Sequence, residues 1–152
     1  YYAANFSIRG KGFNALTMTR TVEYIKKDLQ ALYDLPQKDR SDKIETEITA
    51  LELVHEMGLR GYRFLPVDLY KSDATQFLIE DEALRCPFTS LSGFGEGAAQ
   101  GIMETRESGY ISIEDLKNKA KLSSSTIELL RECGALNGLN DTNQVDFFSL
   151  MK

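Results

Sequence analysis

The stretch Leu91-Ser92-Gly93-Phe94-Gly95-Glu96-Gly97-Ala98-Ala99 decides how this chain is interpreted. Gly93 and Gly95 flank one apolar residue, and most of the residues that follow are small. Glycine tolerates positive φ and lets another backbone approach closely, so the pattern predicts a tight turn that leads directly into a helix. We expect Phe94 and Leu91 to be buried between the flanking helices and to fix the turn.

The first turn of the predicted helix offers a site for an anion. Its backbone N–H groups have no intrahelical partner and lie at the positive end of the helix dipole. Such a helix end can hold a phosphate without any basic side chain. The favoured hypothesis is therefore a helix-hairpin-helix, which clamps the phosphates of duplex DNA without reading their sequence. Its DNA-binding residues would be Gly93, Phe94, Gly95, Gly97 and Ala98.

Other glycine-rich sites fit this stretch less well. A dinucleotide-binding fingerprint fits Gly93-x-Gly95-x-x-Ala98 formally, and Glu114 lies about 20 residues further on, where that fold places an acidic residue. That fold needs a buried strand before the turn and a βαβ unit around it, but Pro87 precedes the turn and no apolar strand follows Arg106. A phosphate-binding loop of the Gly-Lys-Ser type is excluded because no Lys follows the last glycine. A tight turn between helices without a ligand remains open.

Composition limits what the chain can bind. The 152 residues are 42% hydrophobic and 27% charged, which is typical of a globular protein, and the net charge is -5. A protein that holds nucleic acid through a broad basic face should be basic, so any DNA contact must be local or depend on backbone dipoles. Cys86 and Cys133 are isolated, which is typical of reduced cysteines in a cytoplasmic protein. No apolar run reaches the length of about 18 residues that a membrane span needs, so no membrane partner is expected.

The remaining sequence predicts a mostly helical α+β chain. Apolar residues recur at helical spacing from Val22 to Tyr33, before Leu35-Pro36, and again after the predicted N-cap Ser41-Asp42, as far as Gly58. Three further helices are expected at 96–106, 112–119 and 123–133, with Gly134 as the stop of the last.

Two segments between these helical blocks favour β-structure. Residues 64–69 are short, apolar and interrupted by Pro66, which favours an edge strand or an extended crossing. Residues 75–80 and 84–88, joined by the polar turn Asp81-Glu82, predict a small β-hairpin. Glu80, Asp81 and Glu82 form a tight acidic cluster that should be solvated on this turn.

Most of the chain resembles the C-terminal part of the alpha subunit of bacterial DNA polymerase III, of the PolC type. The segments that carry the resemblance are Tyr1–Arg9, Arg60–Ser72, Pro87–Gly95, Ser112–Leu116 and Gly134–Leu136. The chain also lacks an initiator Met, so we expect an excised piece of a longer chain.

This resemblance implies three parts. Residues 1–71 would be the C-terminal part of the polymerase fingers, 72–139 a duplex-binding module of tandem helix-hairpin-helix elements, and 140–152 a linker with a flexible tail. The second element, around Leu122–Ser125, lacks a Gly-x-Gly and would be a degenerate copy. A monovalent cation, K⁺ or Na⁺, would sit on the backbone carbonyls of Thr89, Leu91 and Phe94. The catalytic carboxylates and their Mg²⁺ would lie in a palm domain outside this chain, so the fragment itself would not be catalytic, although its parent would be a nucleotidyltransferase.

The tail carries a second motif. Gln144-Val145-Asp146-Phe147-Phe148 resembles the pentapeptide by which bacterial polymerases bind the sliding clamp, with Phe147 in place of the more usual Leu. Two adjacent Phe residues after a polar linker either fold back on the domain or await a partner. With the resemblance, we expect Gln144, Val145, Asp146, Phe147 and Phe148 to bind the clamp.

The sequence thus predicts a part of a cytoplasmic replicative polymerase that holds duplex DNA and ties the enzyme to its clamp. Its partners would be duplex DNA, the sliding clamp and the rest of the polymerase chain. One alternative is a helix-hairpin-helix adaptor of repair or recombination. Another is a fingers fragment that contacts incoming nucleotide or template through Arg9, Lys11 and Arg20.

Overall fold

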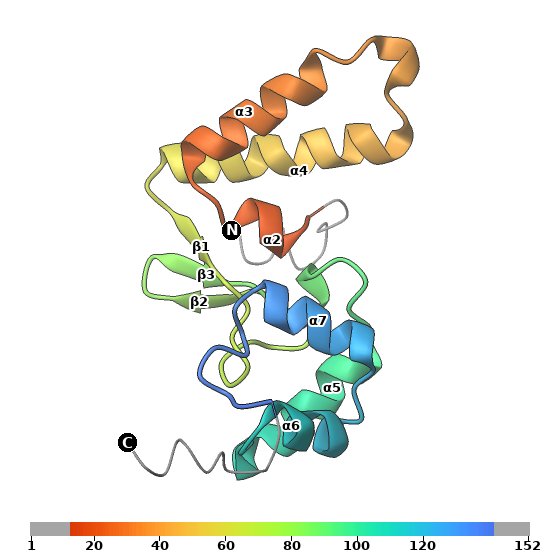
Figure 1. Ribbon diagram of the computed structural model, residues 1–152. Helices are drawn as coiled ribbons and strands as arrows, with labels where there is room; N and C mark the ends of the chain where they lie inside the picture. The colour runs from red at the N-terminus through yellow and green to blue at the C-terminus, as the bar shows by residue number, and fades with distance from the viewer. Residues whose placement is uncertain (1–12, 142–152) are drawn as a thin grey trace, which may run out of the picture.

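A pair of long helices forms one end of the molecule. The computed structural model describes residues 13–141, and within it a short helix, α2 (Ala15–Met18), precedes the pair α3 (Val22–Tyr33) and α4 (Asp42–Leu59). The hydroxyl groups of Thr21 and Ser41 cap α3 and α4. The two helices pack side by side along their apolar faces (Figure 1), with a 3-10 turn at Gln37–Asp39 between them. The predicted N-cap Ser41-Asp42 and both helical stripes are confirmed.

A small sheet follows the helix pair. Its strands β1 (Arg63–Leu65), β2 (Leu78–Glu80) and β3 (Ala83–Arg85) lie in the order β1-β3-β2. β2 and β3 form the predicted antiparallel hairpin, in which Ile79 is opposite Leu84. β1 pairs in parallel with β3, with Phe64 opposite Leu84, and so is an edge strand.

The strands are shorter than the sequence predicts because acidic side chains bind the backbone beside them. The carboxylate of Asp73 accepts the N–H groups of Thr75 and Gln76, so β2 begins only at Leu78. In the same way Asp68 accepts the N–H groups of Tyr70 and Lys71, which makes a turn of residues predicted to be extended. Such local bonds compete with strand ladders for the same donors.

The acidic cluster at the β2–β3 turn is only partly solvated. Asp81 and Glu82 are exposed as predicted, but both oxygens of Glu80 accept hydrogen bonds from the Arg85 guanidinium, at 2.9 and 2.8 Å. Arg85 is buried and also donates to the carbonyl of Pro66, at 3.0 Å. These bonds hold the pKa of Glu80 below its usual value. Glu80 is therefore a structural partner of a buried cation.

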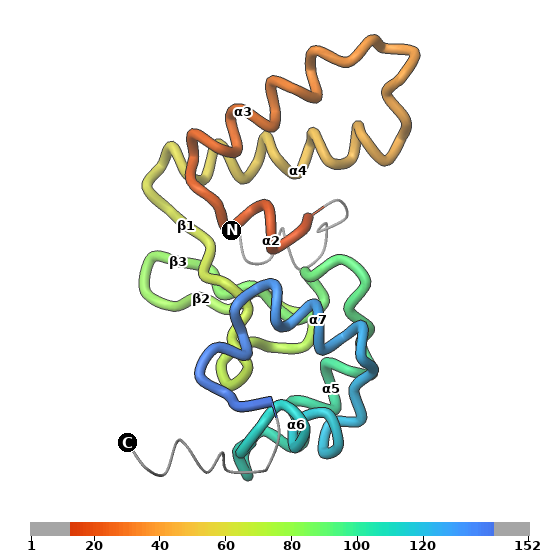
Figure 2. The backbone as a smooth tube through the Cα atoms, viewed as in Figure 1, coloured from red at the N-terminus to blue at the C-terminus, as the bar shows by residue number. Residues whose placement is uncertain are grey.

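The C-terminal half is built from short helices. They are α5 (Glu96–Thr105), α6 (Ile113–Ala120) and α7 (Ser124–Glu132), with single 3-10 turns η2 (Phe88–Ser90) and η3 (Arg106–Ser108). Figure 2 shows the chain passing from the α3–α4 pair through the sheet into this helical end. Gly134, with φ of +83°, follows α7 as its predicted stop. The prediction of a mostly helical α+β chain is confirmed.

One hydrophobic cluster connects these parts. It runs from Phe13 to Leu136, and the rings of Phe13, Phe64 and Phe77 meet edge to face in it. Burial raises the pKa of the Cys86 thiol to about 12, so this group stays neutral and packs as a core residue.

The domain boundary predicted after residue 71 stays a prediction. β1 and β3, which pair with each other, lie on opposite sides of it. Among residues 13–141 no helix is long and apolar enough to cross a bilayer.

Candidate nucleic-acid interface

The glycine hairpin links η2 to α5. Gly93 has φ of +89°, a left-handed conformation that favours glycine, and the N–H of Phe94 bonds the carbonyl of Leu91 at 3.0 Å to close the turn. The element before the hairpin is the single 3-10 turn η2 and not the α-helix that was expected. Only five residues, 86–90, separate β3 from Leu91, and Pro87 lies among them, so no longer helix fits.

Apolar side chains fix the hairpin from inside. Leu91 is completely buried and Phe94 is 6% exposed, which confirms the prediction for both. The ring of Phe94 stacks on the buried ring of Phe88, with 5.6 Å between centroids. Because these anchors lie beneath the turn, its glycine backbone faces outward.

The glycines around α5 serve different purposes. A Cβ added at Gly101 would stand 2.5 Å from the carbonyl oxygen of Ala120, so Gly101 is required for α5 and α6 to cross closely. A Cβ added at Gly95 or Gly97 would meet no other atom within 4 Å. Gly95 also has φ of -79° and ψ of 149°, which any residue adopts. The fold of the described residues therefore gives no reason for glycine at 95 or 97.

The N-terminus of α5 has no side-chain cap. In the described part of the chain, every other α-helix begins with a residue whose side chain accepts an N–H of its first turn: Asn14, Thr21, Ser41, Ser112 and Ser123. At α5 the capping position is Gly95, and it makes no such bond. Gly95, Glu96 and Gly97 are exposed and Ala98 is partly buried, so an anion could reach the N–H groups of this turn.

The second hairpin, between α6 and α7, has a different chemistry. Lys121 takes the left-handed conformation, with φ of +56°, Leu122 is buried beneath the turn, and Ser123 caps α7. The ammonium of Lys117 donates to the hydroxyl of Ser124 at 3.1 Å. This copy therefore has hydroxyl and ammonium groups where the first has bare backbone. The sequence analysis did not identify Lys117 and Lys121 as candidate phosphate contacts, although both lie close to the predicted second hairpin at 122–125.

The carbonyls expected to bind a cation all belong to the first hairpin. Thr89 lies in η2, while Leu91 and Phe94 begin and end the turn. The Leu91 carbonyl accepts the Phe94 N–H, which leaves one lone pair for a cation. Among the described residues no cluster of His, Cys, Asp or Glu could hold a metal ion.

Other polar side chains of the helical end near the N-terminus serve the fold. Glu52 accepts a hydrogen bond from the hydroxyl of Tyr33, which joins α4 to α3 and raises the pKa of Tyr33. Arg20 places its guanidinium 4.1 Å from the centre of the Tyr24 ring. Arg9 and Lys11 lie outside the described residues.

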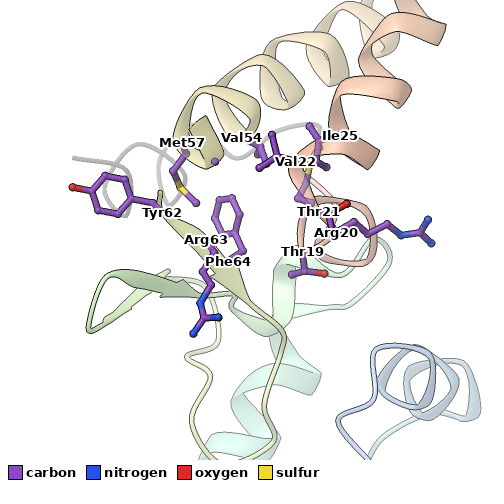
Figure 3. A pocket seen from close by; sticks show the side chains of 12 residues that line it. Thr19, Arg20, Thr21, Val22, Ile25, Val54, Met57, Tyr62, Arg63 and Phe64 are labelled. Carbon is purple, nitrogen blue, oxygen red and sulfur yellow. The ribbon is translucent and has the colours of Figure 1, made fainter. Parts of the chain in front are cut away.

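A small apolar pocket lies near Arg20. Its volume is about 130 Å³, and it lies between the α2–α3 connection, the end of α4 and β1 (Figure 3). Val22, Val54 and Met57 are among its apolar lining, whereas the guanidinium groups of Arg20 and Arg63 point away from its centre (Figure 3). The hydroxyls of Thr19 and Thr21 also belong to residues of the lining, but the first donates to the carbonyl of Ala15 and the second caps α3, so both already serve the fold.

The linker before the tail is docked on α6. The N–H groups of Ile113 and Glu114 donate to the carbonyls of Asn140 and Asp141, at 2.8 and 3.1 Å. The carboxylate of Asp141 also lies 3.4 Å from the guanidinium of Arg131. The predicted clamp-binding residues Gln144 to Phe148 lie outside the described residues.

Comparison with known proteins gives one family match. Residues 61–145, more than half of the chain, match the family model described as the helix-hairpin-helix motif. The matched region contains the sheet, both hairpins and the docked linker.

Curated relatives extend the similarity to nearly the whole chain. A DNA polymerase III of the PolC type from Thermotoga maritima is 42% identical over 149 residues, which is 97% of this chain and 11% of the relative. PolC-type polymerases from Streptococcus thermophilus and Staphylococcus saprophyticus are each 39% identical, over 97% and 99% of this chain. The resemblance to PolC-type DNA polymerase III is thus confirmed, and the chain spans about a tenth of the length of these relatives.

Proposed function

The chain belongs to the helix-hairpin-helix family, and from this premise we propose that it holds duplex DNA, independent of sequence, as part of a replicative polymerase in the cytoplasm. Its relatives are named DNA polymerase III of the PolC type and are about ten times longer. The polymerisation chemistry would belong to the rest of that longer chain. These 152 residues would position the duplex.

One observation carries the proposal: α5 begins with exposed glycines and no side-chain cap. Glycine in a helix costs about 0.5–1 kcal/mol relative to alanine, so Gly97 is a cost that the fold does not require. A phosphate that approaches the first turn would contact the backbone N–H groups directly, and a side chain at 95 or 97 would stand in its way. Gly93, Phe94, Gly95, Gly97 and Ala98 thus remain the proposed DNA contacts.

The second hairpin would provide another phosphate contact, either on the DNA strand that the first hairpin binds or on the complementary strand. Lys117, Lys121 and the hydroxyls of Ser124 and Ser125 surround the N-terminus of α7. Ammonium and hydroxyl groups also donate hydrogen bonds to phosphate, as backbone N–H groups do. With a net charge of -5, the chain has little long-range attraction for DNA, so binding would depend on these two local sites.

A monovalent cation fits the proposal. K⁺ or Na⁺ on the carbonyls of Thr89, Leu91 and Phe94 would place positive charge beside the bound phosphate. The outward glycine backbone and the remaining lone pair of Leu91 support this site.

The tail would provide the second attachment, to the sliding clamp. Burial of Val145, Phe147 and Phe148 would contribute about 1.5–3 kcal/mol each before the cost of ordering them. A peptide of this kind binds weakly by itself, at about micromolar Kd. Because the polymerase and its clamp share one DNA, their high effective concentration would convert weak binding into a stable tether.

The DNA contact is tested with a duplex titration followed by amide chemical shifts. We expect shifts at residues 92–98 and 123–125, and we expect Gly95→Val to remove most of the binding while helicity stays. Valine suits the extended backbone at this position, so the variant should fold. The control Gln100→Val places the same side chain on the exposed face of α5 beyond its first turn, and it should bind as the parent does. Equal binding by Gly95→Val and the parent would show that the hairpin is not the DNA contact.

A further inference from the structure

One short segment, residues 72–74, holds the chain on both sides of the glycine hairpin. We call it the anchor segment. Hydrogen bonds join it to residues 86–89, which lead into the hairpin, and also to α5, which follows the hairpin. The bonds to residues 86–89 run from the hydroxyl of Ser72 to the carbonyl of Cys86, from the N–H of Phe88 to the carbonyl of Asp73, and from the N–H of Thr89 to the carbonyl of Ala74, at 2.7, 3.0 and 3.1 Å.

The anchor segment holds α5 at the end far from the hairpin. Arg106 is the C-terminal capping residue of α5, and its Nη1 donates to the carbonyl of Ser72 at 2.6 Å. The N–H of Ala74 donates to the sulfur of Met103 at 3.1 Å. Ser72 and Ala74 are buried, so water competes little for these bonds. The C-terminal end of α5 is therefore fixed to the same segment as the chain before the hairpin.

The middle of α5 is fixed by its crossing with α6 (Figure 1). At Gly101 the two helices are so close that an added Cβ would stand 2.5 Å from the carbonyl oxygen of Ala120. With a rise of 1.5 Å per residue, Glu96 and Arg106 each lie about 7.5 Å from Gly101 along the helix axis. A helix that tilts about this crossing moves its two ends by similar amounts in opposite directions. The position of Arg106 therefore determines the position of the first turn.

Phosphate binding at the first turn depends on this tilt. A hydrogen bond weakens steeply when its angle at the hydrogen falls below about 120° or its donor–acceptor distance exceeds about 3.2 Å. A tilt that moves the first turn by about 1 Å would take its N–H groups out of this range for a phosphate held by the rest of the interface. The stacking of Phe94 on Phe88 fixes the turn itself, whereas the direction of α5 depends on contacts further along the helix.

We propose that Arg106 is a positioning residue for the duplex-binding hairpin: its hydrogen bond to the carbonyl of Ser72 sets the tilt of α5 and so orients the first-turn N–H groups toward a DNA phosphate. This inference rests on the proposed function of the hairpin and deepens it. Arg106 acts through α5 and makes no contact with the same phosphate, because it lies about 15 Å from Glu96 along the helix axis.

The test uses the 152-residue chain, a fluorescently labelled DNA duplex and a matched pair of variants. Arg106→Met keeps an unbranched side chain and removes its hydrogen-bond donors. Arg60→Met removes the same charge from an exposed arginine that likewise caps the C-terminus of a helix, α4. At fixed salt we expect Arg106→Met to weaken duplex binding about tenfold, comparable to the loss of one hydrogen bond to a charged group. Arg60→Met should weaken it less than about twofold.

The salt dependence separates positioning from direct contact. A side chain that neutralises one phosphate contributes about -0.9 to the log–log slope of affinity against salt. Because Arg106 does not touch the DNA, Arg106→Met should lower the affinity and leave this slope unchanged. A slope that becomes shallower by about one unit would mean that the guanidinium binds a phosphate itself, and the inference would be overturned.

A double-mutant cycle with Gly97→Ala shows whether Arg106 acts through the first turn of α5. If both residues serve the same phosphate contact, the double variant should bind only slightly more weakly than either single variant. Losses that multiply to about a hundredfold would place the action of Arg106 elsewhere and refute the inference. In the DNA-free chain, Arg106→Met should also shift the amide signals of residues 95–98, and unchanged signals there would refute the tilt.

Further outcomes separate this inference from the proposed function. If the parent chain does not bind duplex, the proposed function is wrong and the inference falls with it. If the parent binds and Gly97→Ala binds more weakly, but Arg106→Met equals Arg60→Met, the proposed function stands and the positioning role is refuted.

A second variant decides the case in which Arg106→Met does not fold. Arg106→Lys keeps the charge, but its ammonium is one bond short of the position of Nη1 and so cannot reproduce the bond to Ser72. It should bind duplex more weakly than the parent with an unchanged salt slope. Binding equal to that of the parent would overturn the inference.

Discussion

Replacing Gly97 with alanine should make the chain more stable and a weaker ligand for DNA. Gly97 is the second residue of α5, and an added Cβ would meet nothing within 4 Å. Alanine restricts the unfolded chain and favours the helix, which contributes about 0.5–1 kcal/mol. For a chain of this size the gain corresponds to an increase in Tm of about 2–3 °C, measurable by thermal unfolding.

The same methyl group should interfere with phosphate binding. It would stand on the exposed first turn, where the N–H groups of α5 face outward without a side-chain cap. We expect duplex affinity to fall about tenfold, which corresponds to about 1.4 kcal/mol, in an anisotropy titration at fixed salt. Stability and binding would therefore change in opposite directions, which is the result expected of a residue retained for its ligand.

Gly101→Ala is the structural control. Its Cβ would stand 2.5 Å from the carbonyl oxygen of Ala120, and overpacking of this kind costs about 1–3 kcal/mol. This variant should be less stable than the parent, the reverse of Gly97→Ala. If Gly97→Ala is more stable and still binds duplex as tightly as the parent, the argument that the α5 N-terminus contacts phosphate is refuted.

Three other predictions follow from charge and from the tail. Glu80→Gln should destabilise the chain by about 1–2 kcal/mol at neutral pH, because the buried Arg85 loses its charged partner. Since the pKa of Glu80 is lowered in the folded state, the parent should lose this extra stability as the pH falls below about 4.5. If the difference between parent and variant in urea unfolding does not change with pH, the ion pair is not its cause. The affinity for duplex should fall only shallowly with salt, with a log–log slope between about -1 and -3 for a few neutralised phosphates; a much steeper slope would mean a broad basic interface. Truncation of both Phe147 and Phe148 to Ala should abolish clamp binding and leave duplex binding intact; loss of both activities together would mean that the two rings are core residues.

The helices could be predicted because their signals are local. Thr21, Ser41, Ser112 and Ser123 each cap a helix within three residues of their own position. The apolar period that follows each cap is a property of the same short segment. Burial of Leu91 and Phe94 was likewise predictable, because a Gly-x-Gly turn fixes which neighbouring side chains point inward.

The missed features depend on contacts between distant backbones. The parallel pairing of β1 with β3 joins residues 20 positions apart, such as Phe64 and Leu84, through strands of only three residues. Docking of Asn140 and Asp141 on α6 uses carbonyl groups, which every residue has, and the one side-chain contact that accompanies it, between Asp141 and Arg131, joins residues 10 positions apart on the surface. The sequence also could not show that Gly95 and Gly97 are exposed while Gly101 is packed against α6. All three are glycines within seven residues, and only the structure shows what surrounds each one.

The three helices of the C-terminal half use their N-termini in three ways, and this division accounts for how an acidic chain could hold DNA. The α5 terminus is open and lined by glycine, the α7 terminus has Ser124 beside Lys117, and the α6 terminus is occupied by the carbonyls of Asn140 and Asp141. The α5 terminus thus remains open to phosphate, the capped α7 terminus offers hydroxyl and ammonium groups instead, and the α6 terminus secures Asn140 and Asp141. Two such sites give little affinity by themselves, and the net charge of -5 gives no long-range attraction. Under the proposed function, their grip on the duplex would depend on attachment to a larger polymerase and to the proposed clamp, since tethering raises the local concentration of DNA without adding any contact to this chain.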